Sequence, residues 1–318
     1  MLDIKVATAQ FEPRDNQPEF NLQRIKELTA QAVERGAQIV SFHECCLHGY
    51  SWVQSLSLTR LQAIAEPVPD GAAVRGLMKI AKEFGVIVMA GLFEKDATGA
   101  VYNCYVTVGP EGFLTRFRKL HPFINPHLSP GSCFEVIELA GCKIGFLICY
   151  DNNLPENVRV TTMLGAEVIM MPHVTGGLPS VMPGRGKIDR RIWDNRRLDP
   201  VRLRQEFRGP KGRQWLLKWL PARAWENGVY CVFSNPIGWD HDSVKPGLAM
   251  VVDPFGEIQA ESHQLEDDVV VTTLSASKVA QASGRRYLRA RRPDLYGKLV
   301  EPQESMTEPG WKLDSPDQ

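Results

Sequence analysis

The sequence has no surplus of charge, no paired cysteine spacing and no long apolar run. Lys plus Arg equals Asp plus Glu at 37 each, so global charge predicts neither a nucleic-acid nor a membrane partner. Its seven cysteines contain no CxxC pair and no zinc-like His spacing, which argues against a disulfide framework and fits a reducing compartment. No apolar run reaches the roughly 18 residues of a membrane span. Met1 to Gln10 lacks the regions of a secretory signal, and we therefore expect a cytoplasmic protein.

Apolar runs alternate with amphipathic stretches along most of the chain, which predicts an α/β protein with some antiparallel hairpins. Strands are expected at residues 4–11, 38–42, 86–93, 101–108, 113–119, 134–139, 143–148, 167–171, 230–234, 247–252 and 269–273. Helices are expected at 16–35, 71–84, 155–165 and 213–227. We predict a single domain over residues 1–297 with a basic insertion at about 176–212, followed by a tail at 298–318.

Cys149 is expected at the end of a buried strand, directly before a helix. The apolar run 143–148 precedes it, Pro155 is typical of a first helical turn, and Gly165 is a natural stop. With the next apolar run, this segment predicts a strand–helix–strand unit with a right-handed crossover. A thiol at the positive end of a helix dipole is favoured as the thiolate. The alternative is an inert core cysteine, because free cysteines are often buried as small hydrophobes.

Two further polar residues, Glu44 and Lys119, also follow expected strands. Each alone is explained by a solvated charge. Together with Cys149 they supply what thiol acyl transfer needs: a base for the thiol proton and a cation for the developing oxyanion. We expect the three to meet at the carboxyl edge of one sheet, where ligands bind in open α/β folds.

The sequence resembles the nitrilase superfamily of carbon–nitrogen hydrolases over roughly Ile4 to Tyr296. Three stretches in the same order carry most of the resemblance: Phe42-His-Glu44, Arg118-Lys119-Leu-His121, and Gly145-Phe-Leu-Ile-Cys149-Tyr-Asp151 with the helix behind it. Further matches are Ala222-Arg-Ala, Glu226-Asn227-Gly, Ser234-Asn235, Asp253-Pro-Phe-Gly-Glu257 and Arg291-Arg-Pro-Asp-Leu-Tyr296.

The resemblance implies a four-layer αββα sandwich, a Glu–Lys–Cys triad, no metal or cofactor, and pairing into homodimers or larger homo-oligomers. It implies that Glu44 is the base, Cys149 the nucleophile, and Lys119 with the Tyr150 N–H the oxyanion site. The expected reaction hydrolyses a small linear amide or N-carbamoyl compound through a thioester.

One departure concerns the loop after Lys119. Many amidases of this family carry a second glutamate there, whereas residues 122–131 contain no carboxylate. Asn125 or His127 is a candidate for that space, with a solvated loop histidine as the alternative reading of His127. The other candidates for substrate contact follow the expected strands and the nucleophile: Tyr50, Trp52, Asn152 and His173.

The sequence favours an amidase or carbamoylase over a nitrilase, because Cys149-Tyr150-Asp151 replaces the Cys-Trp-Glu typical of nitrilases. A nitrile hydrolase and a non-catalytic binding module remain the alternatives. Carbamoylases tend to place arginines just after the cysteine, where this chain has Asn152-Asn153. The stretch 181–220, with twelve Lys or Arg against four Asp or Glu, either selects an anionic substrate or is a solvated or subunit-facing insertion.

Overall fold

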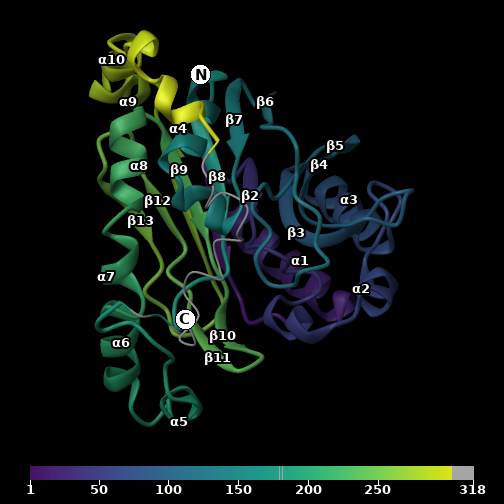
Figure 1. Ribbon diagram of the computed structural model, residues 1–318. Coiled ribbons are helices and arrows are strands. Elements are labelled where there is room, and N and C mark those ends of the chain that lie inside the picture. Colours follow the sequence, from purple (N-terminus) through teal and green to yellow (C-terminus); the bar gives the residue numbers. More distant parts are fainter. Residues whose placement is uncertain (179, 181, 303–318) are drawn as a thin grey trace.

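The computed structural model describes residues 1–178, 180 and 182–302, and it consists of two packed sheets covered by helices (Figure 1). The first sheet has the order β14-β1-β2-β3-β4-β5. Its central strands β1, β2 and β3 are parallel, and the outer pairs are antiparallel. Its strands are β1 Ile4–Gln10, β2 Ile39–Ser41, β3 Ile87–Lys95, β4 Val101–Gly109, β5 Gly112–Arg118 and β14 Asp268–Leu274.

The second sheet has the order β13-β12-β9-β8-β7-β6 and repeats this plan. Strands β7, β8 and β9 are parallel and lie between antiparallel pairs. Its strands are β6 Val136–Leu139, β7 Cys142–Phe146, β8 Val168–Pro172, β9 Tyr230–Ser234, β12 Met250–Val252 and β13 Ile258–Glu261. A separate hairpin pairs β10 Ile237–Asp240 with β11 Ser243–Pro246.

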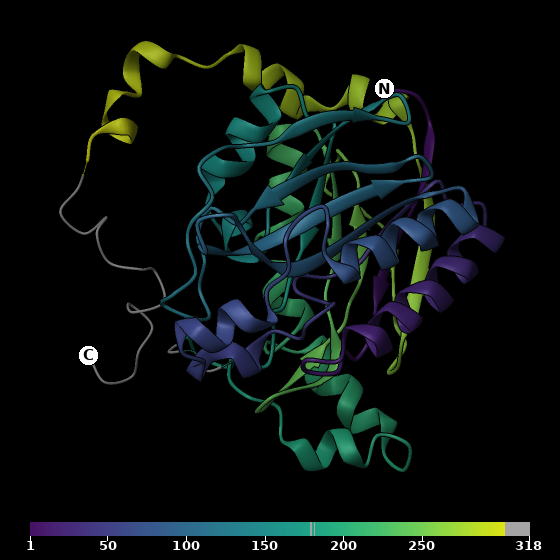
Figure 2. The same cartoon turned by 90° about the vertical axis from the view of Figure 1, so that its right-hand side faces the viewer.

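Helices cover the outer face of each sheet, which gives the four-layer sandwich. Figures 1 and 2 show α1 and α3 on the first sheet, with α4 and α8 on the second. The α-helices are α1 Pro18–Glu34, α2 Leu58–Ile64, α3 Ala72–Phe84, α4 Pro155–Met163, α5 Arg190–Asp194, α6 Pro200–Arg208, α7 Arg213–Leu216, α8 Leu220–Asn227, α9 Ala276–Gln281 and α10 Ser283–Arg289. Short 3₁₀ helices are η1 Ser51–Ser55, η2 Cys149–Asn153, η3 Pro293–Leu295 and η4 Gly297–Val300.

The two sheets pack face to face through an apolar core and a few buried hydrogen bonds. The Thr8 hydroxyl on β1 donates to the Phe233 carbonyl on β9 at 2.8 Å, and the Ser234 hydroxyl donates to the Phe42 carbonyl at 2.9 Å. These bonds join β9 to β1 and to the residue that follows β2. Glu44 follows the first sheet, whereas Cys149 follows β7 of the second. The expectation that one sheet carries all three residues is therefore wrong, and two facing sheets bring them together.

Two parts of the chain differ from the sequence prediction. The helix expected at 213–227 is split into α7 and α8, because Pro221 lacks an N–H and its ring excludes a continuous helix through the preceding turn. The basic insertion, where the sequence analysis predicts no helix, contains α5 and α6, and α5 packs on the β10–β11 hairpin. These elements share their own apolar cluster, which includes Trp193, Phe207 and Val244.

The limits of the single domain and of the tail stay a prediction. Residues 303–318 of that tail lie outside the described residues. All seven cysteines are free. Within the described part of the chain, no helix combines the length and apolar character needed to cross a membrane. The cytoplasmic location stays a prediction.

Candidate active site

Glu44 follows β2, and its buried carboxylate accepts hydrogen bonds from three surrounding groups. Its Oε1 accepts hydrogen bonds from Lys119 Nζ and from the Asn103 amide, both at 2.6 Å. Its Oε2 accepts the Val174 N–H at 3.0 Å. The turn that carries Glu44 lies against β3 at Gly91, where any Cβ would stand 2.2 Å from the Cys45 nitrogen. A glycine is therefore required for the close approach that fixes the Glu44 backbone.

Lys119 follows β5, and its backbone is held on both sides. Its N–H donates to the Asn103 carbonyl at 2.8 Å, and its carbonyl accepts the Gly131 N–H at 2.7 Å. Burial alone would lower the pKa of Lys119, but the carboxylates of Glu44 and Asp151 together oppose it, and the pKa lies above its ordinary value. The side chain is completely buried and remains an ammonium group.

Cys149 stands at a sharp turn between β7 and η2, with a φ of +49°. This left-handed conformation is unfavourable for a residue with a side chain and is characteristic of functional turns. Its Sγ lies 3.9 Å from the Val174 carbonyl oxygen, and the same Val174 residue donates its N–H to Glu44. Val174 thus links the thiol and the carboxylate.

The thiolate expected from the helix dipole is not found. Burial, together with the negative charge of Glu44, raises the pKa of Cys149 to about 12 despite the nearby Lys119. The regular helix α4 begins only at Pro155, after the intervening 3₁₀ turn, so its dipole does not act directly on the sulfur. Cys149 is consequently a thiol at rest and needs a base.

Asp151 ties the loop of Lys119 to the loop of Cys149. Its buried carboxylate accepts the N–H groups of Leu120 at 3.2 Å and His121 at 2.9 Å. It also accepts the Ile148 N–H at 3.2 Å. Because these donors flank both Lys119 and Cys149, Asp151 sets the separation of the two side chains.

Cys149 opens into a cavity of about 240 Å³. The cavity wall comes from the loops after β2, β5, β7 and β8, from the basic insertion and from α7. The described residues that line it are Tyr50, Ser51, Phe123, Ile124, Cys149, Tyr150, Asn153, His173, Val174, Thr175, Leu178, Ser180, Met182, Arg185 and Trp215.

Two of the six predicted substrate-contact residues, Tyr50 and His173, line this cavity. The Tyr50 ring also lies 5.6 Å from Lys119 Nζ. Burial lowers the pKa of His173 well below its ordinary value, and Lys119 adds to this effect, so the imidazole is neutral. Asn152 lies one layer behind the cavity, where its amide donates to the Leu147 carbonyl at 2.9 Å and to His173 Nε2 at 3.0 Å.

The other three predicted substrate contacts have different surroundings. Trp52 donates its indole N–H to the His48 carbonyl at 2.9 Å and packs against the apolar cluster that includes Tyr50 and Val174, without lining the cavity itself. The buried Asn125 amide donates to the carbonyls of Val53 and Leu56, at 2.8 and 2.9 Å, so it fixes the loop. His127 is exposed. The loop after Lys119 instead contributes the apolar residues Phe123 and Ile124 to the cavity wall.

The sequence reasoning missed Asn103 and the positioning part played by Asp151. A signal existed for Asn103, because it is an amide within the apolar run of β4 and is buried. A buried amide requires partners, and since Cys104 pairs with Arg118 across β4 and β5, Asn103 lies opposite Lys119. No signal identified Val174, which acts through its backbone.

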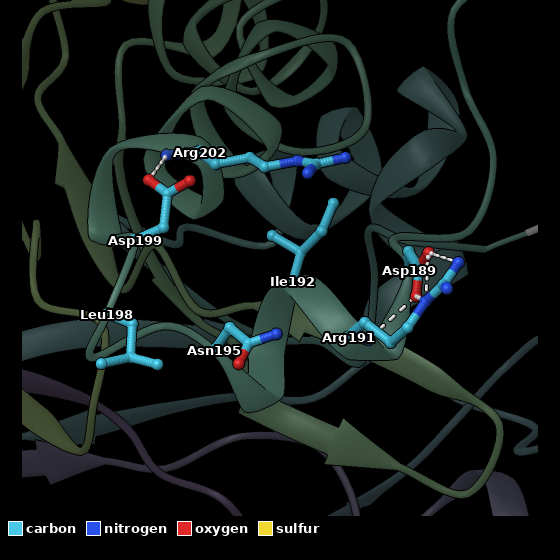
Figure 3. Close-up of a pocket in the computed structure, with 7 residues that line it drawn as sticks. All are labelled: Asp189, Arg191, Ile192, Asn195, Leu198, Asp199 and Arg202. Atoms are coloured by element: carbon cyan, nitrogen blue, oxygen red, sulfur yellow. Dashed lines mark hydrogen bonds and ion pairs between the residues drawn. The ribbon is translucent and has the colours of Figure 1, made fainter.

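A second, larger hollow of about 500 Å³ lies on the basic insertion between α5 and α6 (Figure 3). The Arg191 guanidinium donates to Asp189 at 3.0 Å, and Asp199 caps α6 by accepting the backbone N–H of Arg202 at 3.1 Å. Among the described residues, no group of three or more His, Cys, Asp and Glu side chains is arranged to hold a metal ion.

Known proteins resemble this chain over most of its length. The family model described as carbon-nitrogen hydrolase matches residues 5–283. The chain belongs to this family. An (R)-stereoselective amidase from a Pseudomonas species is 32% identical over 94% of this chain and 95% of its own length. A protein named nitrilase from Pyrococcus abyssi is 28% identical over 85% of this chain and 89% of its own length.

A solved structure with the same fold is that of an amidase from Nesterenkonia sp. AN1 carrying the acetamide moiety of fluoroacetamide on its active-site cysteine. The TM-score is 0.68 at 22% identity, covering 93% of this chain and 97% of that one. This carbon–nitrogen hydrolase thus has the αββα fold of nitrilase-superfamily amidases and acts on C–N bonds.

Proposed function

We propose that this carbon–nitrogen hydrolase cleaves a small linear amide or N-carbamoyl compound through a thioester on Cys149. The supporting observation is the convergence of three groups: Lys119 Nζ lies 2.6 Å from Glu44, and Val174 contacts both Glu44 and the Cys149 sulfur. An uncharged thiol beside a buried carboxylate, with an ammonium group on that carboxylate, is an arrangement suited to acyl transfer.

The first half-reaction forms the thioester. A Glu44 oxygen removes the Cys149 proton as the sulfur attacks the carbonyl carbon of the substrate. The electron pair of the C=O bond moves to the oxygen, and the Lys119 ammonium and the Tyr150 N–H stabilise this oxyanion. When the oxyanion collapses, the C–N bond breaks and the protonated Glu44 gives its proton to the departing nitrogen.

The second half-reaction is hydrolysis. Glu44 removes a proton from water, and the oxygen attacks the thioester carbon. The C–S bond then breaks, the acid leaves, and the sulfur recovers its proton from Glu44. The high pKa of Cys149, about 12, makes the base necessary in the first step and makes reprotonation favourable in the last.

A panel of amides, N-carbamoyl compounds and nitriles of matched size tests the proposal through ammonia release. We expect turnover of amides or carbamoyl compounds and weak or absent turnover of nitriles. Cys149→Ala is expected to abolish turnover while circular dichroism stays unchanged. Turnover by folded Cys149→Ala would overturn the assignment of the nucleophile, and a preference for nitriles would favour a nitrilase.

We also propose that the protein forms a homodimer or larger homo-oligomer. The outer surface of α4 and the residue after it expose three large apolar side chains, Val160, Met163 and Leu164. Such a patch is typical of an interface. Light scattering behind size exclusion tests this proposal: a mass of one chain would contradict it.

A further inference from the structure

The wall of the cavity beside Cys149 contains no carboxylate among its described residues. The Glu44 carboxylate behind the sulfur already accepts three hydrogen bonds, and in the proposed reaction it also takes the thiol proton. A buried N–H without an acceptor is costly. The nitrogen of a bound amide therefore needs an uncharged oxygen of the cavity wall.

The hydroxyl of Ser51, which is buried and lines the cavity, has a fixed direction. It donates to Asp240 Oδ2 at 2.5 Å, and the Ser51 N–H donates to Asp240 Oδ1 at 3.0 Å. Because a carboxylate has no hydrogen to give, the proton of this hydroxyl is committed to Asp240. The Ser51 oxygen can therefore accept a further hydrogen bond but cannot donate one.

The bond to Asp240 also makes the Ser51 oxygen a stronger acceptor. A hydroxyl that donates to a carboxylate is polarised, and its oxygen gains negative charge. Within the described part of the chain, no other group hydrogen-bonds to this oxygen. The Ser180 hydroxyl of the same wall is already engaged, since it accepts the Met182 N–H at 3.2 Å.

Ser51 and Asp240 both stand on well-packed backbone. Asp240 ends β10 and is 4% exposed, and the hairpin that carries it shares an apolar cluster with α5 and α6. Gly49 has a φ of +79°, and a Cβ there would stand 2.3 Å from a carboxylate oxygen of Asp15. The chain before Ser51 thus lies too close to its neighbours for any side chain at position 49, which holds the serine in place.

The position of Ser51 is close to the expected oxyanion site. Ser51 directly follows Tyr50, whose ring centre lies 5.6 Å from Lys119 Nζ. The cavity therefore has donors for a carbonyl oxygen and, beside them, an acceptor for a nitrogen. An amide group requires both, whereas an ester group has no N–H to place.

We infer that the Ser51 oxygen accepts a hydrogen bond from the nitrogen of the substrate amide, and that Asp240 is the positioning residue that keeps the hydroxyl proton out of the cavity. The pair selects substrates whose leaving group carries an N–H, a primary amide or a carbamoyl NH₂, over esters with the same acyl group. This inference rests on the amide hydrolysis proposed above. It gives the β10–β11 hairpin a part in substrate recognition.

Kinetics with butyramide and methyl butyrate, which share an acyl group, test the inference. Ser51→Ala should lower kcat/KM for butyramide by about 10-fold and leave methyl butyrate within about threefold. Asp240→Asn should lower butyramide turnover at least as much, because the new amide donates to the Ser51 oxygen and turns the hydroxyl hydrogen into the cavity. Adding Ser51→Ala to Asp240→Asn should cause no further loss, since the two residues act as one unit.

Ser55→Ala and Asp242→Asn are the matched controls. They make the same changes at exposed positions of the same 3₁₀ helix and of the turn in the same hairpin. Both should leave both substrates unchanged, and circular dichroism checks the fold of every variant. Equal losses on amide and ester in Ser51→Ala, which a merely structural role would cause, would overturn the inference, as would normal butyramide turnover in that variant.

Binding separates this inference from the proposed reaction. Ligand-observed NMR titration of butyramide and methyl butyrate with Cys149→Ala and with Cys149→Ala/Ser51→Ala requires no turnover. Butyramide binding that is weaker by about fivefold or more in the double variant, with ester binding unchanged, supports the inference even if the wild-type protein hydrolyses neither compound. Equal affinity for butyramide, or no saturable binding to either variant, contradicts it even if hydrolysis is fast.

Discussion

Two buried lysines in this protein each face a carboxylate, and their environments differ. Lys119 and Lys245 both have fully buried side chains. Lys119 lies 2.6 Å from Glu44, whereas Lys245 lies 3.6 Å from Asp240. Burial opposes charge in both, but Glu44 raises the pKa of Lys119, while burial prevails and lowers the pKa of Lys245. Burial alone therefore does not decide the direction in which the pKa of a lysine moves.

The partners explain the difference. Glu44 accepts a hydrogen bond from Lys119 directly, and the Asp151 carboxylate adds further negative potential at the ammonium group. Asp240 is engaged mainly elsewhere, since it accepts the N–H and the hydroxyl of Ser51 at 3.0 and 2.5 Å. Lys245 donates to the Ser243 hydroxyl at 2.8 Å. The active-site pair is joined by a direct short contact between ammonium and carboxylate, whereas Lys245 and Asp240 each make their shortest hydrogen bond to a serine hydroxyl.

The largest difference is expected in catalysis when each lysine is replaced by methionine. Lys119→Met should reduce kcat by about 10²–10³-fold, because it removes the cation at the oxyanion. Lys245→Met should change kcat by no more than about threefold, because Asp240 keeps both hydrogen bonds from Ser51. Ammonia release is measured on variants whose folding is checked by circular dichroism. Equal losses in the two variants would remove the distinction between the pairs.

A smaller catalytic effect is expected at Asn103, the second donor to Glu44 Oε1. Asn103→Leu should lower kcat by about 10-fold, because a hydrogen bond to a charged group contributes about 1.5–3 kcal/mol and only part of it concerns the transition state. Ser243→Ala is the counterpart at Lys245 and should leave kcat unchanged. A normal rate in Asn103→Leu would mean that Lys119 and Val174 position Glu44 without help.

His43 is a third buried basic side chain, and burial is the largest cause of its pKa shift. Burial lowers its pKa to about 3. Between pH 3 and about 6.5 the unfolded chain binds a proton that the folded chain does not. The contribution of neutral His43 to the free energy of unfolding is thus complete above pH 6.5. As the pH falls below that value, the free energy of unfolding decreases by up to about 1.4 kcal/mol per pH unit.

Urea unfolding of the wild-type protein and of His43→Leu at pH 7 and pH 5 measures this effect. The free-energy difference between the two should move in favour of the variant at pH 5. A difference independent of pH would show that the folded protein accepts the proton at His43.

The smallest effect expected is on alkaline stability, where the two lysines should act in opposite directions. The pKa of Lys119 lies above the ordinary 10.5, so its stabilising contribution is complete below about pH 10.5 and is lost as the pH rises through the folded value. The pKa of Lys245 lies below 10.5, so its unfavourable contribution at lower pH is relieved as the pH rises towards 10.5. Unfolding free energies of both methionine variants relative to the wild-type protein, measured from pH 8 to 11, should change with opposite slopes. Parallel slopes would contradict the assigned directions.

The sequence predicts the strands that end at Glu44, Lys119 and Cys149, because each apolar run is bounded by breakers or polar residues. The apolar runs alone do not predict that these strands belong to two sheets, because the sequence of a short apolar run does not indicate which strand it pairs with. The hairpin of β10 and β11 was missed for a similar reason. Its residues are almost all buried, so no alternation of apolar and polar side chains marks it.

The lining of the cavity was less predictable than the buried polar cluster. The polar residues Asn125 and His127 were predicted to contact substrate. The apolar Phe123 and Ile124 of the same loop line the cavity instead. Side-chain direction in an irregular loop depends on local turns, here on the Asn125 amide that holds the backbone, and no periodicity encodes it. Backbone groups such as the Val174 N–H leave no sequence signal.

Acid-quenched mass spectrometry of the intact protein during turnover tests the central claim most directly. With a hydrolysed amide, the wild-type protein should gain the mass of the acyl group, peptide mapping should place it on Cys149, and Cys149→Ala should show neither the adduct nor turnover. Sustained turnover without an adduct in Cys149→Ala, or an adduct confined to another thiol such as the exposed Cys133, would contradict the account.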